Sequence, residues 1–290
     1  MLNSRTGTID GLFYEVTGEG EPILFIHGIG GSHEMFHPQV KELSEKGYRC
    51  ITIDLKGSGA SKSPGTRHYL EAHVESIDAL LQELSIPKDK KALTIVGLSY
   101  GGIVSQCYTI KNPQTVKKLV LMDTYGNLVP DDFQDAALTL FGAAIALAPW
   151  LPKKFVRPFF NAYKKWSDAH EEMMKIVNTW RKKDMTLMLL EVFGKNFLRD
   201  LNALEIPTLV IVGDFIPTVV EKSKEILANL PYGSLEVIPD SMDPTNLCQP
   251  KLVNKHLVKF LTDTEFKPND AYIPLDGSAV QEMPNLKIIA

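Results

Sequence analysis

The chain has 290 residues, enough for one large domain or two small ones whose buried core needs no disulfide or metal to hold it together. Its 31 Lys and Arg against 35 Asp and Glu give a formal net charge of -4, which argues against nucleic acid as a partner because phosphate backbones are bound by basic surfaces. The three cysteines are an odd number without metal-ligand spacing, so no disulfide framework, metal site or cofactor is expected.

No segment of the sequence predicts export or membrane insertion. Met1 to Ile9 is polar, so we expect no secretory signal, and a reducing, cytoplasmic setting fits best. The apolar stretch Ala136 to Leu151 is shorter than the ~20 residues that a bilayer core requires, so it predicts a buried or pocket-lining helix. The sequence does not indicate an oligomeric state.

The first part of the chain alternates β-rich runs with helical patterns, which is typical of a parallel sheet wrapped by helices. Apolar residues recur at helical spacing between His68 and Leu84, and another helix is expected from Tyr100. The expected strands are Leu12 to Val16, Pro22 to His27, Tyr48 to Asp54, Leu93 to Gly97 and Lys118 to Asp123.

The strand pattern stops between residues 125 and 200, where segments rich in Leu, Phe, Trp and Met predict several helices interrupted by prolines. Most of these large apolar side chains are expected to pack the helices onto one another. Strands return at Pro207 to Gly213 and Leu235 to Ile238, with helices near 220–230 and 245–261. We therefore divide the chain into an α/β core (1–124 and 201–262), a helical insertion (125–200) and an irregular extension (263–290).

The pentapeptide Gly97-Leu98-Ser99-Tyr100-Gly101 fits the pattern G-x-S-x-G at the point where an expected strand meets an expected helix. A nucleophilic serine on so sharp a turn needs small neighbours, which Gly97 and Gly101 supply. The helix amino terminus would also favour negative charge developing beside Ser99. The pattern predicts a nucleophile elbow, and the alternative is a helix-capping serine in a glycine-rich turn.

A glycine-rich loop, His27-Gly28-Ile29-Gly30-Gly31-Ser32, follows an earlier expected strand. It could bring a backbone N–H toward the same point, so we expect the amides of Ile29 and Tyr100 to form an oxyanion hole, with Gly28 as a loop glycine. His27 and the turn from Asp54 to Ser61 are expected to be structural.

The order of these motifs resembles the α/β-hydrolase superfamily, in its carboxylesterase-like and C–C hydrolase-like branches, over roughly residues 10 to 262. The resemblance implies an eight-stranded, mostly parallel sheet, a helical cap inserted after the sixth strand, and a Ser-Asp-His triad in that chain order. A serine rather than an aspartate at position 99 argues against haloalkane dehalogenase or epoxide hydrolase chemistry.

Two positions depart from the pattern that this resemblance implies. The acid is expected after the strand that ends at Gly213, which makes Asp214 the first candidate and Asp123, after an earlier strand, the second. The segment that carries the histidine in relatives reads Ser241-Met242-Asp243-Pro244 here, with Asn246 and Pro250 keeping the register. Asp243 therefore stands where the base is expected. None of the histidines of the chain fits this role well, and His33 is the least unsuitable substitute.

An aspartate with an ordinary pKa of about 3.9 is a weak proton acceptor, and losing the base of such a triad costs on the order of 10⁴ to 10⁶ in turnover. The main hypothesis is a serine hydrolase of carboxylesterase type that acts on small apolar esters through Ser99, with weakened or altered turnover. The alternatives are an inactive or deliberately altered protein of this fold that binds a small apolar ligand, and a site formed by Ser99, Asp214 and Asp243 with different acid–base chemistry.

Overall fold

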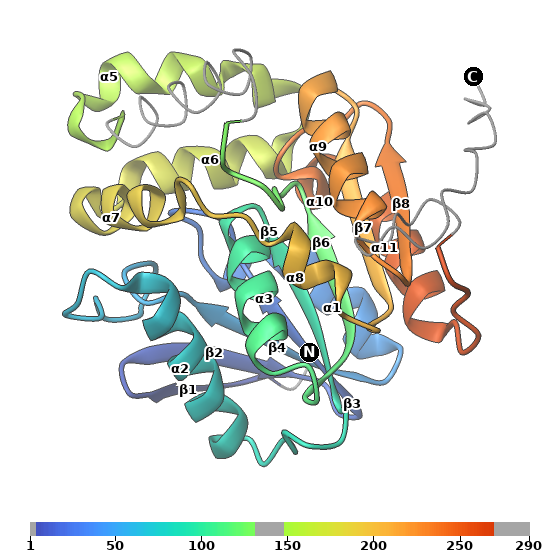
Figure 1. Ribbon diagram of the computed structural model, residues 1–290. Coiled ribbons are helices and arrows are strands. Elements are labelled where there is room, and N and C mark those ends of the chain that lie inside the picture. The colour runs from blue at the N-terminus through green and yellow to red at the C-terminus, as the bar shows by residue number, and fades with distance from the viewer. Residues whose placement is uncertain (1–3, 131–147, 270–290) are drawn as a thin grey trace.

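A computed structural model describes residues 4–130 and 148–269, and it shows one eight-stranded sheet with helices on both faces (Figure 1). The strand order is β1-β2-β4-β3-β5-β6-β7-β8; β1 and β2 are antiparallel to their neighbours, and β3 to β8 run parallel. The strands are β1 (Ser4–Ile9), β2 (Leu12–Thr17), β3 (Glu21–Ile26), β4 (Tyr48–Asp54), β5 (Leu93–Leu98), β6 (Val116–Met122), β7 (Thr208–Gly213) and β8 (Gly233–Ile238).

The sheet is buried on both faces because a separate apolar cluster covers each of them. One cluster joins the sheet to α1 (His37–Glu45) and α11 (Pro250–Thr262). The other joins it to α2, α3, α8 and α9, which are Tyr69–Glu83, Tyr100–Lys111, Leu198–Asn202 and Pro217–Ala228. Every residue of β5 and β7 is buried, which explains why these strands read as continuous apolar runs rather than as alternating patterns.

The helical insertion lies in the chain between β6 and β7, and its helices α5, α6 and α7 lie together over one end of the sheet (Figure 1). Its described elements are η2 (Ala148–Trp150), α5 (Lys153–Val156), η3 (Arg157–Lys165), α6 (Ser167–Thr179), α7 (Lys182–Val192) and α8. Most of the apolar stretch that begins at Ala136 lies outside the described residues. Within the described part of the chain, no helix is both long and apolar enough to cross a membrane.

The large apolar side chains of the insertion divide into two groups. Trp166, Met173 and Met188 are buried, as the sequence predicted. Phe155 and Phe159, which the sequence also predicted as packed, are 57% and 79% exposed. Phe155 lies on α5, where only Val156 is buried, and Phe159 lies on η3, which has no buried residue.

The predicted α/β-hydrolase arrangement, an eight-stranded and mostly parallel sheet flanked by helices, is confirmed, and the structure adds two details. Strand β1 was not expected from the sequence, because Ser4–Ile9 is an edge strand with a mostly exposed, polar pattern. The single helix expected over 245–261 is divided into α10 (Thr245–Cys248) and α11, because Pro250 lacks the N–H that would continue the first helix.

Candidate active site

Ser99 lies on a strained turn between β5 and α3, with φ of 53°. Its N–H donates to the Met122 carbonyl oxygen at 2.8 Å, and its own carbonyl oxygen accepts the Thr124 hydroxyl at 2.8 Å. A Cβ at Gly97 would overlap the Ser105 hydroxyl, and one at Gly101 would overlap backbone oxygens at the end of β3. The strand-turn-helix geometry that G-x-S-x-G predicts is therefore present and depends on both glycines.

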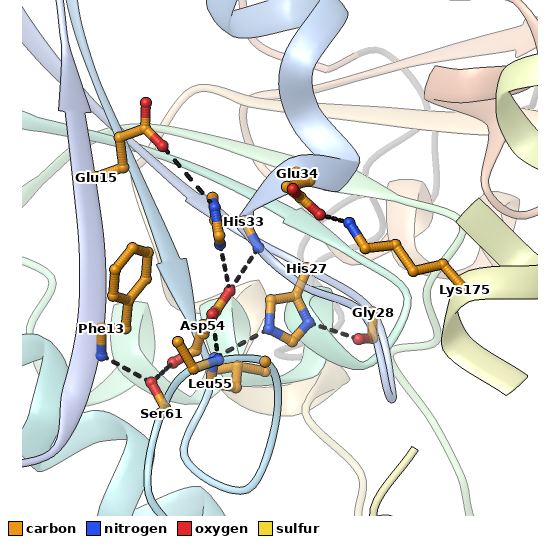
Figure 2. A network of polar contacts seen from close by, with 12 residues as sticks. Phe13, Glu15, His27, Gly28, His33, Glu34, Asp54, Leu55, Ser61 and Lys175 are labelled. Carbon is orange, nitrogen blue, oxygen red and sulfur yellow. Dashed lines mark hydrogen bonds and ion pairs between the residues drawn. The ribbon is translucent and has the colours of Figure 1, made fainter. Parts of the chain in front are cut away.

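The loop that follows β3 passes directly beside Ser99. A Cβ at Gly28 would lie 3.2 Å from the Ser99 Cβ, and Ile29, Ser99 and Tyr100 line one pocket. The fully buried His27 holds this loop, since its Nδ1 donates to the Gly28 oxygen at 2.7 Å while its Nε2 accepts the Leu55 N–H at 2.9 Å (Figure 2). Burial lowers the pKa of His27, so the ring stays neutral and has a structural role, as predicted.

Asp243 occupies the position expected for the base, between β8 and α10. The Ser99 hydroxyl donates a hydrogen bond to its carboxylate. Asp243 is exposed where it lines the pocket in front of Ser99, but its carboxyl group is surrounded by protein, and this burial raises its pKa to about 8. The charge of Asp123 raises this pKa further, whereas the bond from Ser99 opposes the shift.

Asp123 directly follows β6 and is almost fully buried, with φ of 46°. Its Oδ1 accepts the Thr245 hydroxyl at 2.8 Å and the Gly213 N–H at 3.2 Å, and its Oδ2 accepts the Thr245 N–H at 2.8 Å. Burial raises the pKa of Asp123 to about 6, although all three hydrogen bonds lower it. Because the pKa of Asp243 is the higher of the two, Asp243 holds its proton at neutral pH more readily than Asp123 does.

The structure does not bring Asp214 to this pair. Asp214 is exposed, does not line the Ser99 pocket, and accepts only a long bond of 3.4 Å from the Ser241 N–H. The feature of the sequence that pointed to Asp123 was its position directly after β6, the strand that lies beside β5. His33 lies outside this pocket and is bound through Nδ1 to Asp54 at 2.8 Å (Figure 2). No histidine is among the described residues that line the Ser99 pocket.

The pocket in front of Ser99 has a volume of about 550 Å³. Its polar lining residues include Ser99, Asp123, Tyr125, Tyr163, Lys222 and Asp243. Its apolar walls come from α3, α7, α9 and the segments beside them, and they include Ile103, Leu128, Leu189, Val192, Phe193 and Val219. The space suits a small organic molecule with an apolar body and one polar end. Within residues 4–130 and 148–269, no cluster of three or more His, Cys, Asp or Glu could hold a metal ion.

Residues 21–243 match the family model described as the alpha/beta hydrolase fold. The chain is 26% identical over 278 residues to the non-heme chloroperoxidase of Streptomyces lividans, covering 88% of this chain and 98% of that protein. A bromoperoxidase from Bacillus anthracis (TM-score 0.76, 23% identity, 90% of this chain and 100% of that one) has the same fold. So does a thermophilic esterase from Thermogutta terrifontis (TM-score 0.73, 24% identity, 89% of this chain and 98% of that one). The chain belongs to the alpha/beta hydrolase fold family.

Proposed function

We propose that this protein is a slow hydrolase of small apolar carboxylic esters, with Ser99 as its nucleophile and Asp243 in place of the histidine base. The observation that carries this proposal is the hydrogen bond from the Ser99 hydroxyl to the Asp243 carboxylate at a strained strand-to-helix turn. An apolar pocket in front of Ser99 and similarity to proteins named esterase and lipase support it.

The reaction follows from the positions of these groups. The Ser99 oxygen attacks the ester carbonyl carbon while ionised Asp243 accepts the hydroxyl proton. The backbone N–H groups of Ile29 and Tyr100 stabilise the resulting oxyanion. Asp243 returns the proton to the departing alcohol, which leaves an acyl group on Ser99. Water then attacks this acyl group with Asp243 again accepting a proton, and the free acid departs as Ser99 recovers its hydrogen.

The raised pKa is what would make Asp243 usable as a base. An ordinary carboxylate is too weak an acceptor for a serine proton, but one whose pKa is about 8 has a proton affinity in the range of a catalytic histidine. At neutral pH most Asp243 is protonated and cannot accept, so turnover is slow and rises with pH. Asp123 acts as a positioning residue in place of Asp214, since its charge raises the pKa of Asp243.

The direct test measures p-nitrophenyl butyrate hydrolysis between about pH 5 and pH 10 for the natural chain and for Ser99→Ala. We expect a slow rate that increases with a midpoint near pH 8 and disappears in Ser99→Ala. A fluorophosphonate probe should label Ser99 stoichiometrically, and faster at pH 9 than at pH 6. Absence of both turnover and labelling across this range would overturn the proposal.

The raised pKa of Asp243 also favours a second candidate, a protein of this fold that binds a small apolar ligand without turning it over. With Asp243 protonated, the carboxyl group beside the Ser99 hydroxyl is uncharged, and the pocket of about 550 Å³ would accept an uncharged ligand. In that case butyrate esters would bind equally well to the natural chain and to Ser99→Ala, and neither would release p-nitrophenol at any pH tested.

A further inference from the structure

Four large apolar side chains of the helical insertion lie in water. Trp150, Leu151, Phe155 and Phe159 are each more than half exposed, and Phe159 is exposed to 79%. They belong to η2, α5, η3 and the turn after η2, and these elements pack on α6 and α7. Figure 1 shows α5 on the side of α6 and α7 that faces away from the sheet. Single exposed apolar residues are ordinary, but four within ten residues of chain indicate a binding surface.

The inner face of η3 fixes this orientation. Phe160 and Tyr163 both pack against the apolar cluster that joins the sheet to α1 and α11, and their ring centroids lie 6.1 Å apart. The Tyr163 hydroxyl donates to the Asp243 carbonyl oxygen at 2.6 Å, which ties the same face to the segment after β8. Phe159 directly precedes Phe160 and is therefore left on the outer face of η3.

The same stretch of the chain is basic. Residues 136–167 contain five Lys and Arg and no Asp or Glu, although the whole chain has a net charge of -4. Lys165 forms an ion pair with Asp240. The other four cations are exposed, and none of them forms an ion pair with a carboxylate of the described residues; they are Lys153, Lys154, Arg157 and Lys164.

These cations lie among the exposed apolar groups. The Lys154 ammonium lies over the Phe155 ring, 5.0 Å from its centroid. Lys153 and Arg157 donate only to uncharged oxygens, those of the Asn178 backbone and side chain, at 2.7 and 2.8 Å. Their positive charge is therefore not neutralised within the described part of the chain.

A lipid surface satisfies both features. Aromatic side chains settle at the boundary between headgroups and acyl chains, and the flexible stems of Lys and Arg let their charges reach anionic headgroups. A second copy of this chain fits less well, because a two-fold contact through this surface would place its cations opposite their own counterparts.

We propose that this surface of the insertion docks the protein on an anionic lipid bilayer, with Trp150, Phe155 and Phe159 among the headgroups and the four unpaired cations against the lipid phosphates. The contact is peripheral, because α5 and η3 are far too short to cross a bilayer. The inference does not rest on the proposed hydrolase activity, since it concerns an outer surface rather than the Ser99 pocket.

Sedimentation of the full-length protein with lipid vesicles tests the proposal. Vesicles of phosphatidylcholine and phosphatidylglycerol in equal amounts should bind the protein saturably, whereas phosphatidylcholine alone should bind it weakly. Sodium chloride at about 0.5 M should release most of it, because salt screens the attraction to the headgroups. Trp150 is the most exposed of the three tryptophans, so binding should shift the fluorescence to shorter wavelength, and Trp150→Phe should abolish this change.

The apolar contribution is tested by combining Phe155→Ser with Phe159→Ser. The affinity for the mixed vesicles should fall at least about tenfold, because two rings no longer enter the interface. Both side chains are exposed, so the melting temperature of this variant should match that of the natural chain. That match shows that the loss of binding does not come from unfolding.

The contribution of charge is tested by combining Lys154→Gln with Lys164→Gln. The affinity should fall about twentyfold, since each cation beside an anionic membrane contributes about a fivefold factor. Lys90→Gln with Lys91→Gln is the matched control, because it removes the same charge from exposed lysines just before β5, at the end of that strand opposite Ser99. This control should bind the mixed vesicles as the natural chain does.

The proposal is overturned if the mixed vesicles do not bind, if phosphatidylcholine alone binds equally well, or if the control pair weakens binding as much as Lys154→Gln with Lys164→Gln. Light scattering without lipid tests another occupant: a dimer that Phe155→Ser with Phe159→Ser dissociates would assign the surface to a second copy. Poly-glutamate that binds as tightly as the vesicles would assign it to an acidic protein. Either result would also overturn the proposal.

Discussion

Thr245 holds Asp123 by two hydrogen bonds, from its hydroxyl and from its backbone N–H, each 2.8 Å long. Thr245 lies two residues after Asp243, so the short segment that presents Asp243 to Ser99 also fixes the second carboxyl group. The two carboxyl groups are thus brought together by the backbone, and the charge of Asp123 raises the pKa of Asp243.

Replacing Thr245 by Val should destabilise the protein by about 2 kcal/mol, because a buried carboxylate loses a hydroxyl donor. The pKa of Asp123 should also rise further, since one of the bonds that lowers it has gone. Urea denaturation at pH 7 measures the change. Thr245→Ser keeps the donor and should recover most of the lost stability, so equal losses in both variants would show that packing of the Thr245 methyl group matters instead.

Asp243→Asn should change how stability depends on pH. The pKa of Asp243 is raised from an ordinary value near 3.8 to about 8, so the folded state binds a proton that the unfolded chain has released between these values. The stabilisation of the folded state that this proton provides is complete below about pH 4 and is lost as the pH rises through about 8. Above pH 8 we expect the free energy of unfolding of Asp243→Asn to exceed that of the natural chain by about 1 kcal/mol. This value is smaller than the full pKa shift would give, because solvent in the pocket screens the charge of Asp243.

Urea denaturation curves collected at about pH 5 and pH 9 would check this expectation. The advantage of Asp243→Asn should shrink toward the lower pH. If the natural chain and the variant kept the same stability difference at both values, the pKa of Asp243 would not be raised in the folded state.

Asp243→His should increase turnover of p-nitrophenyl butyrate by at least about 100-fold, because an imidazole is a better proton acceptor at neutral pH and Asp123 can orient it. The midpoint of the pH–rate profile should move down from about 8 toward the ordinary histidine range near 6.5. Steady-state kinetics between about pH 5 and pH 10 would show both effects. The doubly substituted chain with Ser99→Ala serves as the control and should be inactive.

Gly101→Ala should destabilise the protein by about 3 kcal/mol or prevent folding. The added Cβ would overlap the backbone oxygens of Ile26 and His27, so β3 and α3 would have to move apart. Gly65→Ala is the matched control, because a Cβ there meets nothing within 4 Å and only its φ of +72° disfavours alanine, by about 1 kcal/mol. Thermal denaturation of both variants would show the difference, and equal melting temperatures would contradict the close approach at Gly101.

Much of the fold could be predicted from the sequence because buried parallel strands leave continuous apolar runs and their helices leave a period near 3.6. Each strand from β2 to β8 coincides with an expected run to within a few residues. The exception is β1, whose polar residues gain their strand conformation only by pairing with β2 at the sheet edge. For Phe155 and Phe159 the prediction of a packed side chain was wrong, because both are exposed. Hydrophobicity alone does not say which side of a helix is covered.

Within the site, the sequence by itself determined that Ser99 lies on a tight turn and that an aspartate occupies the position of the base, because glycine spacing and chain register are local properties. Only the tertiary structure decided that Asp123 rather than Asp214 lies beside Asp243, since that depends on the direction in which each loop turns after its strand. The raised pKa of both carboxyl groups was equally invisible in the sequence, because it arises from burial and, for Asp243, also from the charge of Asp123, which lies 120 positions away in the chain.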